Sequence, residues 1–218
     1  MTYDSSWLKD KQRSIRDAFP INLGLRVHRA ISWIKKAENE PDPDGQFIFL
    51  WIAFNACYAE YTERSYNRPE RGRLKEFFGK IDTLDQGGLI YEAIWEQYSQ
   101  AIRTILNNKY VFEPYWNHFN QIKGHEDWAN EFEKAKARSL TALRDHKTAR
   151  ILYIVFDRLY VLRNQLVHGG ATYDGGINRA QVKDGAAILG HLIPLFVNIM
   201  MDHPDSVWGK PFYPVTDD

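Results

Sequence analysis

The sequence has almost no cysteine, and this absence excludes several classes of protein. With Cys57 alone among 218 residues, the chain cannot form an intramolecular disulfide, and no CxxC or HExxH spacing occurs. We therefore expect a protein of the reducing cytoplasm that holds no metal and no other cofactor. Cys57 itself is interpreted as a small buried side chain.

An excess of charge of one sign is also absent, because Lys plus Arg and Asp plus Glu both number 28. The balanced charge gives no general attraction for nucleic acid and no reason to expect DNA specificity, so contact with RNA must come from local patches. Residues 134–150 form one such patch, with six basic residues and one acid. An ordinary solvated face is favoured over a phosphate-binding stripe, because the basic residues spread around the predicted helix. A second basic patch comprises Lys9, Lys11, Arg13 and Arg16.

Long hydrophobic runs and targeting signals are missing as well. The segment 47–59 is apolar apart from Asn55, but it is shorter than the roughly 20 residues that span a bilayer. It predicts a central buried helix. The first residues lack a basic segment followed by an apolar one, so we expect no secretory signal and no membrane partner.

No segment shows the alternation of period two that marks strands, and the sequence therefore predicts an all-α protein. Proline and glycine separate long segments rich in Ala, Leu, Glu, Lys and Arg. We expect an N-terminal extension over 1–21, one helical domain over 22–202 and a C-terminal tail over 203–218. The expected helices span about 22–39, 44–64, 71–84, 88–107, 112–122, 126–145, 148–168 and 178–202.

Aromatic residues are concentrated between Tyr110 and Trp128. This pattern favours a small satellite core, with a base-stacking surface as the alternative. We expect these residues to form a helical insert at about 108–125.

The segment 162–169 carries the strongest indication of function. Arg163, Asn164 and His168 follow the apolar run 151–162 at the end of a predicted helix. Polar groups at such a place are either neutralised inside the protein or take part in chemistry. In the structural interpretation, Arg163 caps backbone carbonyls or pairs with an acid such as Asp157, Asn164 makes a buried hydrogen bond and His168 is a cation at the helix C-terminus.

In the functional interpretation, two copies of the chain combine these residues. On an ideal helix Arg163 and His168 lie about 140° apart, so one chain does not obviously bring both to the same substrate. Ile154 and Val161 add an apolar side opposite the predicted core stripe, which we expect to contact a second chain. A two-fold axis beside this helix would gather two guanidinium and two imidazole groups, a set suited to cleaving a phosphodiester.

The run Arg163-Asn164-x-x-x-His168, late in a helical chain and followed by Gly-Gly and another long helix, resembles the motif of the HEPN family (higher eukaryotes and prokaryotes nucleotide-binding). The Apea-like, abortive-infection branch is the most similar, and its buried helix resembles the segment 47–58. The resemblance covers roughly residues 22–202, although only the motif is specific.

The resemblance implies an up-and-down helical bundle that dimerises and cleaves RNA without metal. The ribose 2′-hydroxyl would attack the adjacent phosphorus and leave a 2′,3′-cyclic phosphate. In that reaction His168 would carry the proton, Arg163 would stabilise the phosphoryl oxygens and Asn164 would position one of them. Family members serve as toxins, antiviral effectors or RNA-processing factors, so an antitoxin or defence protein is a further expected partner. The alternative is a non-catalytic dimeric helical scaffold that binds RNA, a nucleotide or a partner protein.

Overall fold

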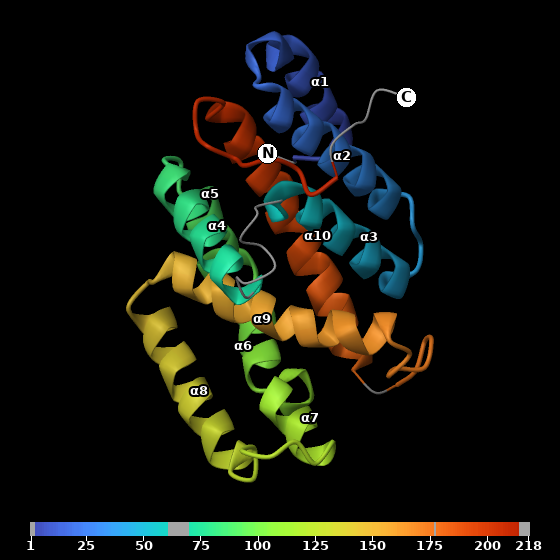
Figure 1. Cartoon of the computed structure of the whole chain (residues 1–218), viewed down its shortest axis with the longest axis vertical. Coiled ribbons are helices and arrows are strands. Elements are labelled where there is room, and N and C mark those ends of the chain that lie inside the picture. Colours follow the sequence, from blue (N-terminus) through green and yellow to red (C-terminus); the bar gives the residue numbers. More distant parts are fainter. Residues whose placement is uncertain (1–2, 61–69, 177, 214–218) are drawn as a thin grey trace.

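The computed structural model describes residues 3–60, 70–176 and 178–213, and in these ranges the chain is helical apart from turns and loops (Figure 1). The one β-type pairing in this part of the chain is an isolated bridge between Glu60 and Pro211. The α-helices are α1 (Ser5–Ile15), α2 (Ile21–Glu38), α3 (Pro43–Tyr58), α4 (Glu70–Leu84), α5 (Leu89–Glu92), α6 (Ser99–Leu106), α7 (Glu113–Phe119), α8 (Trp128–Arg144), α9 (Thr148–Val167) and α10 (Arg179–Asp202).

The arrangement is organised around α9 and α10. In Figure 1, α9 lies across the long axis of the molecule, with α1, α2 and α3 on one side and α7 and α8 on the other. The helix α3 packs mainly against α2 and α10, and α4 packs against α9. At the centre, the buried ring of Phe54 contacts that of Phe156 in α9, with 4.4 Å between the ring centres, and the rings of Phe78 and Phe196 also lie close to Phe54. The main core therefore joins helices from both halves of the sequence.

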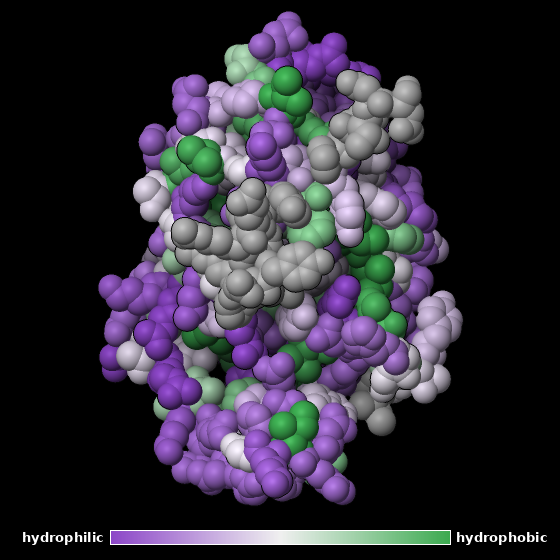
Figure 2. Space-filling view, viewed as in Figure 1, coloured by the Kyte–Doolittle hydropathy of each residue, from purple (hydrophilic) through white to green (hydrophobic). Residues whose placement is uncertain are grey.

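The most buried helix is α10. The sequence predicts that α3 is the central buried helix, but α3 is buried mainly along one face. Along α10, residues are buried almost continuously from Ile188 to Met201. This helix is long and apolar enough to cross a membrane by composition, but 78% of its most apolar stretch is buried inside the structure. On the face shown in Figure 2, hydrophobic residues form separate spots, and the surface over α7 and α8 is mostly hydrophilic. The burial of α10 is that of a central core helix.

The helix α1 lies in the segment expected to be an extension without a helix. Asp4 caps it by accepting a hydrogen bond from the backbone N–H of Trp7 at 2.8 Å, and Leu8 is completely buried. Lys11 donates to Asn198 of α10 at 2.6 Å. The segment is therefore part of the bundle. Its sequence is mainly polar, but its few apolar residues gather on one face of the helix, as in an amphipathic helix that packs on a core.

A π-helical turn, η2 (Ala93–Gln97), interrupts the helix expected over 88–107. In this turn the N–H of Tyr98 donates to the carbonyl of Ala93 at 2.9 Å. The buried residues Ile94 and Ile102 are eight positions apart, which on a regular α-helix would place them about 80° apart. The extra residue of the π turn reduces this angle. Ile94 in the turn and Ile102 in α6 therefore both face the core.

A second, smaller hydrophobic cluster confirms the prediction of a satellite core. It contains Phe112, Tyr115 and Phe132, with Trp116 and Trp128 packed against it. Most of these residues come from α7 and α8, and Phe112 lies between α7 and the 3-10 turn η3 (Lys109–Val111) that precedes it. The expected helices 112–122 and 126–145 are shorter in the structure, because the chain leaves the helical conformation at Asn120 and has positive φ at Gln121 and Gly124.

The segment after α10 returns to the bundle. Trp208 is buried, and the guanidinium of Arg26 donates to the carbonyls of Gly209 and Lys210 at 3.3 and 3.0 Å. The same guanidinium donates to the carbonyls of Ala56 and Cys57 in the last turn of α3. Arg26 thus joins α2, the end of α3 and the C-terminal segment. The end of the helix expected over 44–64 differs: α3 stops at 58, and residues 61–64 lie outside the described ranges.

Candidate functional site at the end of α9

The helix α9 ends in the way that its glycines predict. His168 is the C-cap, and Gly169 has a φ of 70°. The N–H of Gly170 donates to the carbonyl of Gln165 at 2.8 Å and the N–H of Gly169 donates to that of Leu166, which is the Schellman arrangement. This geometry turns the chain sharply after His168. The imidazole therefore lies at the tip of a helix and outside its regular part.

The structure brings two of the three predicted site residues together. Arg163 Nη1 donates to Asn164 Oδ1 at 2.9 Å, and both residues are half-buried. His168 is exposed. Among the described residues, its ring makes no hydrogen bond or ion pair with Arg163 or Asn164. One chain therefore provides an Arg–Asn pair and a separate, accessible imidazole.

The acidic partner considered for Arg163 is engaged elsewhere. Asp157 accepts a hydrogen bond from Arg71 Nε at 3.0 Å, and Arg71 also pairs with Glu113. The guanidinium of Arg163 is instead satisfied in part by the neighbouring amide of Asn164. That contact orients both side chains on the same side of the helix end.

The apolar residues expected to contact a second chain are covered within one chain. Val161 is only 8% exposed, and Ile154 is partly buried against the main core. The helix α9 is contacted by α4, α6, α8 and η3 in addition to α3 and α10. This side of α9 therefore leaves little apolar surface for a second chain, and the dimer itself stays a prediction. The sequence could not show this cover, because apart from α8 and α10 the elements that contact α9 are not its neighbours in the sequence.

A cleft of about 740 Å³ lies beside the motif, and sequence reasoning did not find it. Gln165, in the middle of the motif, connects to it: Gln165 Nε2 donates to the carbonyl of Tyr110 at 2.6 Å, and Asn178 Nδ2 donates to Gln165 Oε1 at 2.8 Å. Both partners line the cleft. The complete lining is rich in amide and aromatic side chains: Thr104, Asn107, Asn108, Lys109, Tyr110, Trp116, Asn178 and Gln181.

The side chains of this cleft include amides and aromatic rings, which are types that can contact unstacked bases. Amide side chains can hydrogen-bond with the edges of unstacked bases, and aromatic rings can stack on their faces. Tyr110 is 37% exposed, and the ammonium of Lys109 lies 5.3 Å from the centre of its ring. The doublet Asn107-Asn108 directly before the aromatic segment was the available signal in the sequence.

The loop between α9 and α10 is held in place by a cluster of ion pairs. Arg179 at the start of α10 contacts Asp44 at 2.6 Å, Asp174 at 3.2 Å and Asp42 at 3.5 Å. Asp42 also caps α3 through the N–H of Gly45. The chain that leaves His168 is thus attached to the beginning of α3, which restricts the orientation of the motif.

Other titratable residues offer little alternative chemistry. Burial raises the pKa of the Cys57 thiol to about 12, so this residue remains a neutral thiol, as expected for a core side chain. Within the described ranges, no three His, Cys, Asp or Glu side chains are grouped closely enough to hold a metal ion. Cys57 therefore offers no thiolate nucleophile, and the exposed imidazole of His168 remains the group predicted for proton transfer.

Comparison of the chain with family models, with curated proteins and with solved structures finds no match. The resemblance of Arg163, Asn164 and His168 to the HEPN motif consequently rests on the sequence pattern alone.

Proposed function

We propose that this chain is a metal-independent endoribonuclease of the HEPN type, acting in the cytoplasm in a defence or toxin system. The observation that carries the proposal is the position of His168. It is exposed at the end of α9 and lies three residues after Gln165, so the two share a side of the helix. Gln165 in turn contacts two residues of the amide- and aromatic-lined cleft. His168 does not itself line the cleft, and the proposal is that an RNA strand bound there extends past Gln165 to the imidazole.

The proposed reaction is a transesterification at one phosphodiester. The ribose 2′-oxygen forms a bond to the adjacent phosphorus, its proton passes to an imidazole, and the bond from phosphorus to the 5′-oxygen breaks. A proton delivered to the 5′-oxygen completes the step and leaves a 2′,3′-cyclic phosphate and a 5′-hydroxyl. Imidazole is suited to both proton transfers near neutral pH. Arg163 would stabilise the charge that develops on the phosphoryl oxygens, and Asn164 would position one of them.

A second copy of the chain would complete this site. Two imidazoles could divide the proton transfers, and a guanidinium from the partner could reach a phosphate that Arg163 of the same chain does not face. Because the Ile154 and Val161 side is covered, we place the dimer contact at the end of α9. Exposed apolar residues are present there, since Val167 is 49% exposed and Tyr173 is 73% exposed.

The alternative is a non-catalytic scaffold that binds RNA, a nucleotide or a partner protein such as an antitoxin. It is supported by the contact between Arg163 and Asn164, because a guanidinium that is half-buried and bonded to its neighbour has a structural role in the free chain. The cleft would then bind a ligand without cutting it.

Cleavage of RNA in EDTA separates the two functions. We expect the purified protein to cut single-stranded RNA and to leave 2′,3′-cyclic phosphate ends. His168→Ala should lower the rate about a hundredfold or more, the usual contribution of a general acid or base. His28→Ala, which removes an exposed histidine on α2, is the matched control and should keep full activity. Equal decay of RNA with the wild type and His168→Ala would refute the enzymatic proposal, because a contaminating nuclease would then explain the cleavage.

Light scattering behind a sizing column tests the shared site. We expect a dimer at micromolar concentration and a shift toward monomer in Val167→Asp, which places a charge among the exposed apolar residues. A monomeric wild type with full nuclease activity would contradict the two-chain site while leaving the catalytic role of His168 intact.

A further inference from the structure

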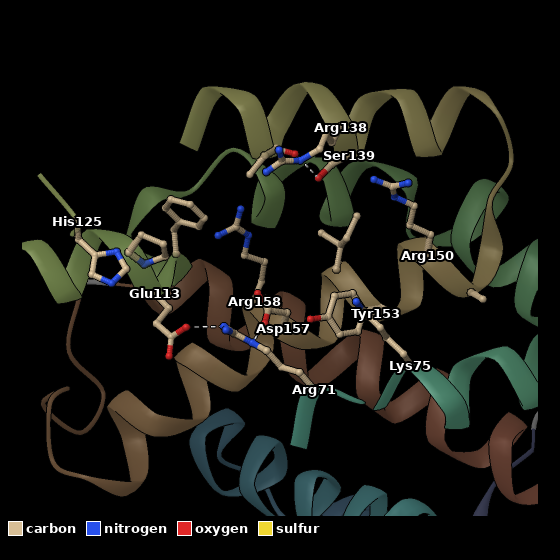
Figure 3. A pocket seen from close by; sticks show the side chains of 15 residues that line it. Arg71, Lys75, Glu113, His125, Arg138, Ser139, Arg150, Tyr153, Asp157 and Arg158 are labelled. Carbon is tan, nitrogen blue, oxygen red and sulfur yellow. Dashed lines mark hydrogen bonds and ion pairs between the residues drawn. The ribbon is translucent and has the colours of Figure 1, made fainter. Parts of the chain in front are cut away.

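A second pocket lies between α8 and α9, separate from the motif. Its volume is about 700 Å³, a size typical of small-molecule sites. Figure 3 shows His125 at one end of this α8–α9 pocket and Arg150 at the other, with Arg158 between them. The pocket is lined by five Lys and Arg side chains and by only two carboxylates, which leaves an excess of three positive charges. Its cationic residues are Arg71, Lys75, Arg138, Arg150 and Arg158.

The guanidinium of Arg158 is the unusual member of this set. Arg158 is only 3% exposed, and its Nε and Nη1 have no hydrogen-bond partner among the described residues. Its central carbon lies 4.3 Å from the centre of the Phe112 ring, which holds one face of the group. Burial lowers its pKa to about 10, so it still carries its charge at neutral pH. A buried cation with unused donors is costly unless an anion completes it.

The carboxylates of the pocket do not supply that anion. Glu113 and Asp157 both pair with Arg71, which lies below Arg158 in the view of Figure 3. Against the effect of burial, Asp157 raises the pKa of Arg158 through its charge, but it makes no hydrogen bond with Nε or Nη1 of that guanidinium. His125 offers a further unused donor, because its Nε2 lies 3.2 Å from the amide nitrogen of Asn117 and its Nδ1 is buried without a partner in the described part of the chain. If Nε2 accepts from that amide, Nδ1 carries the hydrogen. The pocket thus contains buried donors and an excess of positive charge.

We infer that the α8–α9 pocket binds a small ligand through a terminal phosphoryl group, which Arg158 contacts from inside and Arg138 and Arg150 contact from the exposed rim. A phosphomonoester carries close to two negative charges at neutral pH and several acceptor oxygens, which matches the excess charge and the unused donors. A terminal phosphate can enter end-on and reach a group as buried as Arg158. An internal phosphodiester of an RNA strand has a neighbour on both sides, so a small ligand fits the pocket better.

Calorimetric titration tests this inference with inorganic phosphate, AMP, adenosine, citrate and a 5′-hydroxyl RNA oligonucleotide. We expect phosphate and AMP to bind and adenosine not to bind, and tighter binding of AMP than of phosphate would identify a nucleoside phosphate as the natural class. Equal affinity for citrate and AMP would overturn the choice of phosphate. Binding of the RNA oligonucleotide that AMP displaces would overturn the choice of a small ligand, and an absence of binding by every probe at millimolar concentration would overturn the site.

Variants locate the binding. Arg158→Met should weaken AMP binding about tenfold to a hundredfold, as expected for hydrogen bonds to a charged group. Its unliganded form should unfold at the same temperature as the wild type or higher, because an unpartnered buried charge is removed. If it fails to fold, Arg138→Gln and Arg150→Gln change exposed residues and should each weaken binding about twofold to fivefold.

The control variant Arg103→Gln removes an exposed arginine of α6 outside the pocket, and it should bind AMP as the wild type does. His168→Ala should do the same, so loss of RNA cleavage and loss of anion binding are separate results. Equal affinity of the wild type and all three pocket variants would overturn the assignment.

Discussion

The buried guanidinium of Arg26 should make one of the largest single contributions to stability in this chain. It donates four hydrogen bonds of 3.0–3.3 Å, two to the last turn of α3 and two to the segment after α10. The carbonyls of Ala56 and Cys57 lie where a helix has no partners of its own. Replacing Arg26 by Met keeps most of the volume and removes every donor.

The expected loss follows from two opposing effects. A hydrogen bond from a charged donor contributes about 1.5–3 kcal/mol, so four bonds counted separately would exceed 6 kcal/mol. Against this, the free energy for taking a guanidinium out of water is several kcal/mol, and Met avoids it. Burial lowers the pKa of Arg26, which reflects the same desolvation. We therefore expect Arg26→Met to lower the free energy of unfolding by about 3 kcal/mol, which corresponds to about 6–12 °C in Tm.

Urea denaturation followed by circular dichroism measures this change. Arg29→Met is the matched control, because Arg29 lies on the same helix and donates to the carbonyl of Tyr213 in an exposed position. It should change the free energy of unfolding by about 0.5 kcal/mol or less. Limited proteolysis of Arg26→Met should also show faster cleavage within residues 203–213. If Arg26→Met and Arg29→Met unfold at the same urea concentration, the four contacts contribute no net stability and the reasoning fails.

Two further predictions concern packing and pH. A Cβ at Gly185 would lie 2.8 Å from Phe47 and 3.0 Å from Leu159, so Gly185→Ala should destabilise the protein by about 1–3 kcal/mol. In the control Gly190→Ala, on the same helix, the nearest contact of the new Cβ is 3.7 Å, and this variant should be neutral or stabilising. Equal Tm values for the two variants would contradict this prediction. Burial lowers the pKa of His191, so the unfolded chain takes up a proton at a higher pH than the folded protein does. The free energy of unfolding should therefore fall as the pH drops below about 6.5, and His191→Gln should make this dependence on pH less steep. Urea titrations at several pH values measure it, and the same pH dependence in both proteins would show that His191 does not contribute.

The parts of the fold that the sequence predicts well are those with strong local patterns. The helices α2, α8, α9 and α10 begin and end within two residues of their expected bounds, because apolar periodicity and turn residues mark them. The helix α1 was not predicted although its apolar residues share one face, because those residues are few in a mainly polar segment; its packing against α2 and α10 is tertiary and is not visible in the sequence. The π turn at Ala93–Gln97 was missed for a similar reason, since packing on both sides selects it.

The candidate site divides in the same way. The position of His168 beside two glycines is local, and its place at the helix end was predictable. The cleft is not local, because Gln165 meets Tyr110 across 55 positions of the sequence. Arg158 does have a signal in the sequence, because it is the single cation within the strongly apolar run 151–162. A charge in such a run indicates a partner, and the structure provides none for two of its nitrogens in the residues it describes.

The meeting of the two ends of the chain has a kinetic consequence. Lys11 and Asn198 are 187 positions apart, and Arg26 and Lys210 are 184 positions apart. Forming such contacts closes very long loops, and the average sequence separation of contacts sets how fast a domain folds. We expect refolding to be slower than in helical bundles built from neighbouring hairpins. During synthesis, α1 and α2 cannot form their contacts with α10 and residues 208–211 until these last segments have left the ribosome.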